Sequence, residues 1–133
     1  MYGKSKLNQE RIEQGLEPVL LEDAESLMFA NWLRFMELTF THIANERKTH
    51  IALGRKLKRM GLCKGFPDYL VIVPIEGKKH IVCVEMKRKI KSLSAVSPKQ
   101  KEWVQILNEC EEVEAYIAYG ADDAIAFIQS LMK

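Results

Sequence analysis

The feature that most constrains the fold of this chain is a pair of apolar runs joined by a short turn. Both runs, Tyr69 to Pro74 and His80 to Glu85, are rich in the valine and isoleucine that favour β-strands. Between them lies the turn-like segment Glu76-Gly77-Lys78. We therefore predict a β-hairpin. Because the chain has no glycine-rich phosphate loop of the P-loop or Rossmann type, we expect its chemistry around this hairpin.

Periodic apolar positions and capping residues predict further elements on both sides of the hairpin. An acidic first turn, Glu22, Asp23 and Glu25, suits the start of a helix, and Ser97 followed by Pro98 suits the N-cap and first position of another. The predicted helices span Lys6 to Gln14, Glu22 to Phe40, Ile51 to Met60, Ser97 to Cys110 and Asp122 to Met132. Two further strands are predicted over Thr41 to Ala44 and Glu114 to Tyr119. A turn is predicted over Asn45 to Lys48.

Length and composition are consistent with one α/β domain. A chain of 133 residues with 47% hydrophobic content can bury a single core, so we expect residues 1–20 to form a polar arm and residues 21–133 a single domain. The absence of a long apolar run and of a signal peptide predicts a cytoplasmic protein. The three cysteines, Cys63, Cys83 and Cys110, include no CxxC pair, so we expect them to be reduced and largely buried.

The net charge of +2 conceals a strong segregation of charge along the chain. Residues 1–46 carry four basic and eight acidic groups, whereas residues 102–133 carry one basic and seven acidic groups. Residues 47–101 carry fifteen basic and three acidic groups, a net charge of +12. Such a concentration is typical of a surface that neutralises phosphates, although a solvated charged face would have the same composition.

Two carboxylates and a lysine stand where the hairpin strands should meet. Glu85 and Lys87 are two residues apart, so a strand places both on one face, where the pattern calls for apolar residues. Asp68 follows Pro67 at the start of the other strand. Paired strands would let two oxygen ligands converge on a hard divalent cation. Taken singly, Glu85 and Lys87 are better explained by a solvated salt bridge at a strand end, and Asp68 is a common type of turn residue.

Together with their neighbours, these residues form three linked motifs. They are Gly65-Phe66-Pro67-Asp68, Val84-Glu85-Met86-Lys87-Arg88, and Ser97-Pro98-Lys99-Gln100-Lys101-Glu102-Trp103. In order and spacing they closely resemble the VRR-NUC family of the PD-(D/E)xK nuclease superfamily, and in particular its stand-alone phage and bacterial members. The resemblance implies a restriction-endonuclease-like core, in which a mixed central sheet is flanked by helices.

The same resemblance assigns roles to individual residues. It implies that Asp68, Glu85 and the main-chain carbonyl of Met86 bind Mg²⁺ or Mn²⁺, and that Lys87 is the catalytic lysine. Lys87 could orient the attacking water or offset negative charge that develops on the phosphate.

Two further polar residues are candidates for the site. Glu25 shares an apolar stripe with Leu21, Met28, Phe29 and Trp32, and the family carries a glutamate on its first helix, so we expect a catalytic and metal-binding role. Interaction with the helix N-terminus, or Glu22 as the true match, are the alternatives. Gln100 matches a family glutamine, and with Ser97 it also fits a capping box.

The expected function is that of a divalent-metal-dependent, structure-selective DNA endonuclease resembling Holliday-junction resolvases and acting as a homodimer. A nuclease acting on flaps, nicks or duplex DNA, and a DNA-binding module without catalysis, are the alternatives. Trp103 is expected in the core, and no histidine is assigned to the site. The predicted DNA-backbone contacts are Arg55, Lys56, Arg59, Lys64, Arg88, Lys89 and Lys91.

Overall fold

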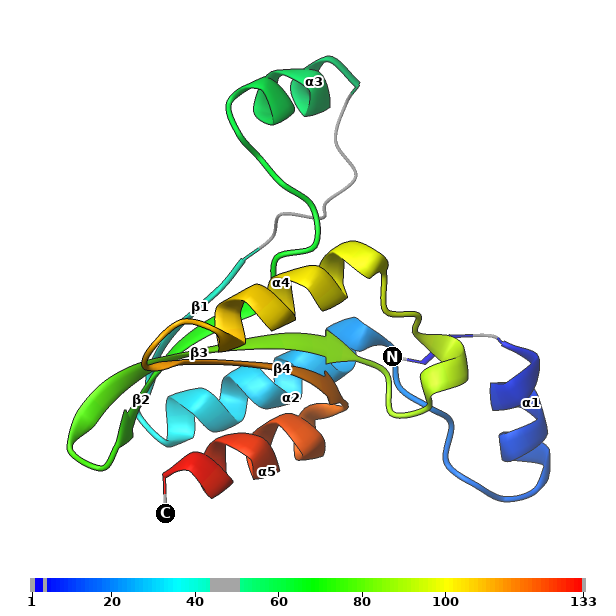
Figure 1. Ribbon diagram of the computed structural model, residues 1–133. Helices are drawn as coiled ribbons and strands as arrows, with labels where there is room; N and C mark the ends of the chain where they lie inside the picture. The colour runs from blue at the N-terminus through cyan, green and yellow to red at the C-terminus, as the bar shows by residue number, and fades with distance from the viewer. Residues whose placement is uncertain (1, 4, 44–50, 133) are drawn as a thin grey trace.

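A computed structural model describes residues 2–3, 5–43 and 51–132 and contains one mixed four-stranded sheet in the order β1-β2-β3-β4 (Figure 1). The β2–β3 and β1–β2 pairs are antiparallel, and β3–β4 is parallel. The predicted hairpin is confirmed: Tyr69 pairs with Val84 and Ile75 with Lys78. The strands are β1 (Thr39–His42), β2 (Tyr69–Ile75), β3 (Lys78–Lys87) and β4 (Val113–Tyr119).

Helices cover both faces of this sheet. In Figure 1, α4 (Pro98–Asn108) lies on one face, and α2 (Glu22–Phe35) and α5 (Ala121–Leu131) lie side by side on the other. Alternate residues of β2 and β3 point toward α2 and α5, as the period of two requires. The apolar core on this side contains Phe29, Leu33, Tyr69, Val71, Val73, Val82, Val84, Met86, Ala118, Ala121, Ala124 and Ile128.

Helix α2 begins where its acidic first turn predicts but ends earlier than expected. The predicted helix ran to Phe40, whereas α2 stops at Phe35 because Glu37 adopts a left-handed φ of 57°. The N–H of Leu38 then donates to the carbonyl of Leu33, a pattern common at helix C-termini. Strand β1 consequently starts at Thr39, two residues before the predicted start at Thr41.

The buried face of α2 also differs from the predicted stripe. Leu21 and Met28, which the predicted apolar stripe included, are 40% and 43% exposed. Leu21 is the N-cap and therefore stands outside the helix that it precedes. The buried stripe contains Glu25, Phe29 and Leu33, which are four residues apart.

The cysteines occupy different environments. Cys83 is fully buried on β3, but Cys63 and Cys110 are exposed, so the expectation of largely buried cysteines was wrong for these two. Each of the two lies outside the regular elements, beyond the end of α3 or of α4, where side chains are not drawn into the core.

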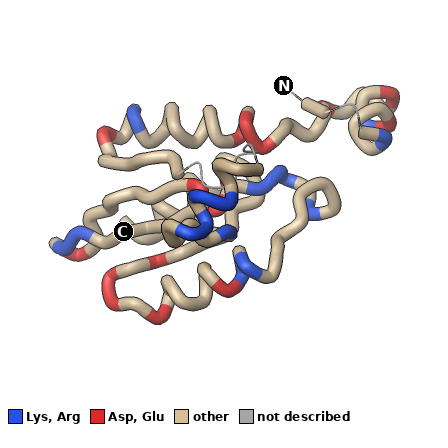
Figure 2. The backbone as a smooth tube through the Cα atoms, turned by 90° about the horizontal axis from the view of Figure 1, so that it is seen from above, with Lys and Arg blue, Asp and Glu red and all other residues tan. Residues whose placement is uncertain are grey.

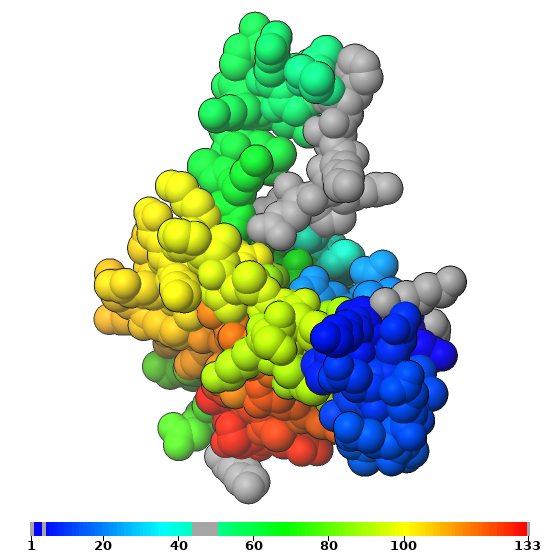
Figure 3. Space-filling model, turned by 90° about the vertical axis from the view of Figure 1, so that its right-hand side faces the viewer, coloured from blue at the N-terminus to red at the C-terminus, as the bar shows by residue number. Residues whose placement is uncertain are grey.

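The N-terminal segment contains α1 (Lys6–Glu13) and is attached to the rest of the fold by polar contacts. The amide of Asn8 is buried and exchanges hydrogen bonds with the main chain of Val19. Figure 3 shows this segment, in blue, lying against the yellow-green loop that follows β3, which contains η1 (Lys91–Leu93).

Helix α3 (Ile51–Arg59) stands away from the sheet at the tip of a long connection between β1 and β2 (Figure 1). Every residue of α3 is described, and none is buried. Figure 2 looks down onto this projection, with basic positions in blue. The predicted turn over Asn45 to Lys48 lies outside the described residues. None of the described helices has the length and apolar character needed to cross a membrane.

Candidate active site

The candidate site forms where β2 and β3 separate. Strand pairing ends at Tyr69 and Val84, and continuing this register places Asp68 beside Glu85 and Pro67 opposite Met86. Beyond the last pair, the N–H of Met86 donates to Oδ2 of Asp68 at 2.9 Å. A side-chain carboxylate thus replaces the main-chain acceptor that a longer β2 would have supplied.

The same separation affects the carbonyl of Met86. In a strand the N–H and C=O of one residue point toward the same neighbour, so this carbonyl also faces Asp68. Pro67, at the opposite position, has no N–H to donate to it. The main-chain oxygen that the family resemblance assigned to a metal therefore faces the gap between the strands.

Glu85 and Lys87 form a buried ion pair on the face of β3 that α4 covers. Nζ of Lys87 lies 3.6 Å from Oε2 of Glu85, and their side chains are only 7% and 3% exposed. The predicted common face is confirmed. Cys83 precedes them on this face, and burial raises the pKa of its thiol to about 11, so it packs as a neutral group.

Glu25 reaches this end of the sheet from the buried face of α2. Its side chain is fully buried, and Oε1 accepts a hydrogen bond of 3.1 Å from the N–H of Ala121, the first residue of α5. Oε2 is buried as well and has no hydrogen-bond partner among the described residues. The helix N-terminus that Glu25 contacts is thus that of α5, not that of its own helix. Glu22, the alternative match, instead accepts a hydrogen bond from Ser94.

Gly120 brings Glu25 and the end of β3 together. Its N–H donates to the carbonyl of Lys87 at 2.9 Å, and its φ is +97°. A Cβ atom here would lie 2.6 Å from Cγ of Lys89 and 3.4 Å from Oε2 of Glu25. The sequence pattern indicated this glycine only as the end of a strand, and its close packing could not be predicted without the three-dimensional contacts.

Gly65 has a comparable role on the other side of the site. Its φ is +95°, and a Cβ atom would lie 2.8 Å from the carbonyl carbon of Lys99 and 3.0 Å from the nitrogen of Gln100. The segment that leads into Asp68 is therefore packed directly against the first turn of α4. Only glycine fits at this position.

Gln100 fulfils one of its two predicted roles. Its Oε1 accepts from the N–H of Ser97 at 2.9 Å, and its own N–H donates to Oγ of Ser97, so the capping box is confirmed. Gln100 is 4% exposed. The cap uses one of the two lone pairs of its amide oxygen. Trp103, predicted in the core, is half-buried, packs edge-on against Phe66 and donates to the carbonyl of Lys64.

The donor set at this end of the sheet fits a divalent cation of the Mg²⁺ type. Asp68, Glu85 and the Met86 carbonyl offer hard oxygen atoms, and Glu25 adds a buried carboxylate oxygen nearby. Within the described residues, no three His, Cys, Asp or Glu side chains are gathered closely enough to hold a metal by themselves. Mg²⁺ needs no such cage, because it uses one or two carboxylates and completes its shell with water and substrate phosphate.

The predicted phosphate-contacting residues are distributed over three environments. Arg88 is 9% exposed, and its guanidinium donates to the carbonyls of Leu20 and Val19 at 2.8 and 2.7 Å. Its role is therefore to hold the N-terminal segment, and it is not retained among the proposed DNA contacts. Lys89 pairs with Asp122 at 3.5 Å, and Nζ of Lys91 lies 5.0 Å from the centre of the Tyr119 ring.

The remaining basic residues lie on the projection. Arg55, Lys56 and Arg59 are exposed on α3, and Lys64 is exposed on the chain that returns to β2. Figure 1 shows α3, which carries Arg55, Lys56 and Arg59, standing away from the sheet that contains β3. Lys64 lies closer to the sheet, because its carbonyl accepts a hydrogen bond from Trp103 of α4. The fold thus leaves three of the four cations on a separate element.

Comparisons with known proteins identify the family and the fold. The sequence matches the VRR-NUC domain over residues 7–122, a span that includes every predicted site residue. No curated protein matched. Among solved structures, a chain described as a VRR_NUC domain protein aligns with a TM-score of 0.57 and 26% sequence identity, over 85% of this chain and 88% of that chain. The α/β fold class and the family resemblance are both confirmed.

Proposed function

Because this chain belongs to the VRR-NUC family of nucleases, we propose that it is a divalent-metal-dependent DNA endonuclease whose active site centres on Asp68, Glu85 and Lys87. The observation that supports this assignment best is the buried Glu85–Lys87 pair at the point where β2 and β3 separate. Burying both charges costs free energy that apolar residues at these positions would not cost. A functional requirement for the charges accounts for their presence.

In the proposed mechanism, Asp68, Glu85 and the Met86 carbonyl hold Mg²⁺ or Mn²⁺. The bound ion would polarise the scissile phosphate and lower the pKa of a water molecule. The water would release one proton to solvent and bond through its oxygen to phosphorus, the bond to the leaving oxygen would break, and that oxygen would receive a proton from solvent. Asp68 is fixed for this role by its hydrogen bond from Met86.

Lys87 would stabilise the negative charge that develops on the phosphate oxygens during the reaction. Its 3.6 Å contact with Glu85 suits an ammonium group that offsets negative charge on the phosphate oxygens. Orientation of the attacking water is the second role that an ammonium could perform. Glu25 supplies a further buried oxygen, either to the ion directly or through a bound water.

We further propose that the enzyme acts as a homodimer on four-way DNA junctions. A junction has two-fold symmetry, so an isologous dimer would present one active site to each of two opposing strands. The proposal rests on the resemblance to stand-alone resolvase-like members of the family. Arg55, Lys56, Arg59, Lys64, Lys89 and Lys91 are the proposed contacts to the DNA backbone.

The test is cleavage of a labelled four-way junction and a matched linear duplex, each with Mg²⁺, with Mn²⁺ or with EDTA. We expect metal-dependent cutting that is faster on the junction and is lost in Asp68→Asn. Equal cutting of both substrates would overturn the junction preference but retain the nuclease. Tight binding of either substrate without metal-dependent cutting would instead identify a DNA-binding module.

A further inference from the structure

Helix α3 presents an apolar stripe that none of the residues the structure describes buries. Leu53 and Leu57 are four residues apart, and Met60 follows three residues later, so all three lie on one side of the helix. Leu53 is 47% exposed and Met60 72% exposed. The opposite side carries Arg55 and Lys58. An amphipathic helix of nine residues gains most of its stability from packing of its apolar face, so this stripe needs a partner.

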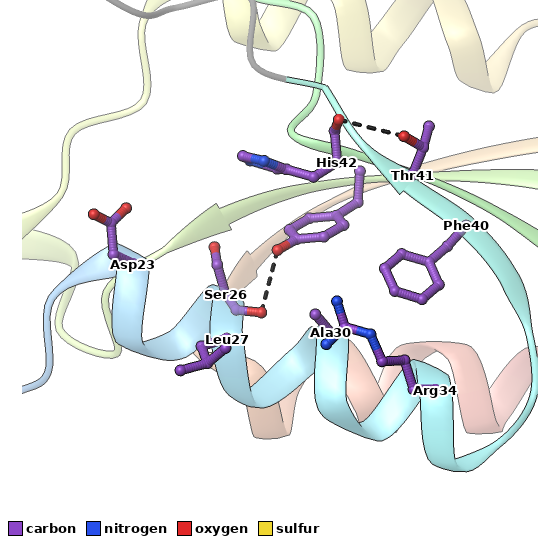
Figure 4. Close-up of a pocket in the computed structure, with 9 residues that line it drawn as sticks. Asp23, Ser26, Leu27, Ala30, Arg34, Phe40, Thr41 and His42 are labelled. Atoms are coloured by element: carbon purple, nitrogen blue, oxygen red, sulfur yellow. Dashed lines mark hydrogen bonds between the residues drawn. The ribbon is translucent and has the colours of Figure 1, made fainter.

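An open groove of about 510 Å³ lies between α2 and the edge strand β1 (Figure 4). Its apolar lining is made by Leu27, Ala30 and Phe40. The charged residues at the groove are Asp23, from the first turn of α2, and Arg34, whose guanidinium lies 5.7 Å from the centre of the Phe40 ring.

The connection that carries α3 begins and ends beside this groove. His42, the last residue of β1, and Tyr69, the first residue of β2, both line it. Between them, α3 stands away from the body of the molecule (Figures 1 and 3). A projection that starts at the edge of a groove can enter the same groove of a second copy across a two-fold axis, and symmetry then returns the partner's projection to the first copy.

The charges of the two surfaces are complementary. Residues 47–67 contain seven basic residues and no acidic one. Residues 22–42, which contain the groove's helix and edge strand, carry four acidic residues, of which Glu25 is buried, and one basic residue, Arg34. A strongly basic partner surface would repel α3. The net negative surface of α2 and β1 attracts α3 instead.

We propose that α3 of one copy packs its Leu53, Leu57 and Met60 stripe into the α2–β1 groove of a second copy, and that the exchange is reciprocal. This inference rests on the proposed homodimer and assigns its interface. With the apolar stripe covered, Arg55 and Lys58 face outward. Dimerisation would then fix the orientation of a cationic surface for the DNA backbone.

The test is the dimer dissociation constant, measured by analytical ultracentrifugation for the full chain and four single variants. Leu57→Gln alters the stripe, and Ile51→Gln is its control because Ile51 is 73% exposed on the opposite side of α3. Leu27→Gln alters the groove, and Met28→Gln is its control on α2. None of these residues is buried, so the fold should survive each change. We expect Leu57→Gln and Leu27→Gln to weaken the dimer on the order of 10-fold or more, and both controls to leave it unchanged.

Mixing the two interface variants tests the exchange itself. In a dimer of one Leu57→Gln copy and one Leu27→Gln copy, both defects fall in one contact and the other contact is intact. The proposed contact between Leu57 and Leu27 makes two defects in one contact cost less than their sum, so the mixture should dimerise more tightly than either variant alone. A dimer that is insensitive to all four changes, or a mixture no tighter than its components, would overturn this interface while leaving the homodimer in place. A wild-type chain that stays monomeric would overturn both, and the cleavage assay would then decide separately on the nuclease.

Discussion

At the scale of single residues, the two carboxylate oxygens of Glu25 lie in different environments. One of its oxygens accepts from the N–H of Ala121, and the other is buried without a hydrogen-bond partner among the described residues. A purely structural residue would have its oxygens satisfied, because an unsatisfied buried acceptor costs about 1–3 kcal/mol. The second oxygen supports the proposed role of Glu25 in holding the ion directly or through a water molecule.

The substitution Glu25→Gln should separate a structural role of this side chain from a role in binding the metal ion. The amide oxygen can still accept from Ala121, so the free energy of unfolding should change by no more than about 1 kcal/mol. The concentration of Mg²⁺ needed for half-maximal cleavage should rise by at least about 10-fold, because a charged ligand has been removed. Urea denaturation and a Mg²⁺ titration of the cleavage rate measure the two effects. A folded variant with an unchanged Mg²⁺ dependence would assign Glu25 a role in the fold alone.

Cys83 provides a prediction for pH dependence. Burial raises the pKa of its thiol from 9.0 to about 11, so the folded state favours the neutral form. The stability from this group is complete below pH 9 and is lost as the pH rises toward 11, by about 2 kcal/mol at the upper end. The free energy of unfolding of the wild type should therefore fall more steeply between pH 9 and 11 than that of Cys83→Ala. Parallel curves for the two proteins would contradict this prediction.

At the scale of elements, the segment before β2 is positioned by its contact with α4. Gly65 and Gly61 both have positive φ values, +95° and +104°. A Cβ atom at Gly65 would lie 2.8 Å from Lys99, whereas a Cβ atom at Gly61 would meet nothing within 4 Å. Comparing substitutions at these two positions therefore separates the effect of backbone strain from the effect of steric crowding.

Substitution by alanine should reveal this difference. Gly61→Ala should cost about 1 kcal/mol of unfolding free energy through strain alone. Gly65→Ala should cost more and should also slow cleavage, because the shift required by the clash is transmitted to Asp68 three residues later. Denaturation curves and cleavage rates of the two variants check both statements. Equal effects of the two substitutions would mean that the contact with α4 does not position Asp68.

At the scale of the whole molecule, the sequence predicted the elements better than the contacts between them. The hairpin, the capping box at Ser97 and the shared face of Glu85 and Lys87 follow from short-range patterns, and all three are confirmed. The end of α2 was wrong because the left-handed φ of Glu37 leaves no clear local pattern.

Contacts between distant segments could not be predicted from local patterns. Glu25 and Ala121 are 96 positions apart, and Arg88 and Val19 are 69 apart. The sequence indicated a charged residue in each case but not its partner. Arg88 therefore looked like one more basic residue of a phosphate-binding loop, whereas its burial against main-chain carbonyls gives it a structural role.

We propose that Glu85 and Lys87 are both required for metal-dependent hydrolysis of phosphodiester bonds. The most direct test of this proposal is the single-turnover rate of DNA cleavage by Lys87→Gln, with Lys79→Gln, an exposed position on the same strand, as the matched control. Circular dichroism would establish that both variants are folded. We predict a loss of at least about 100-fold for Lys87→Gln and a rate within about twofold of wild type for Lys79→Gln. A folded Lys87→Gln protein that cleaves DNA at the wild-type rate would contradict the account.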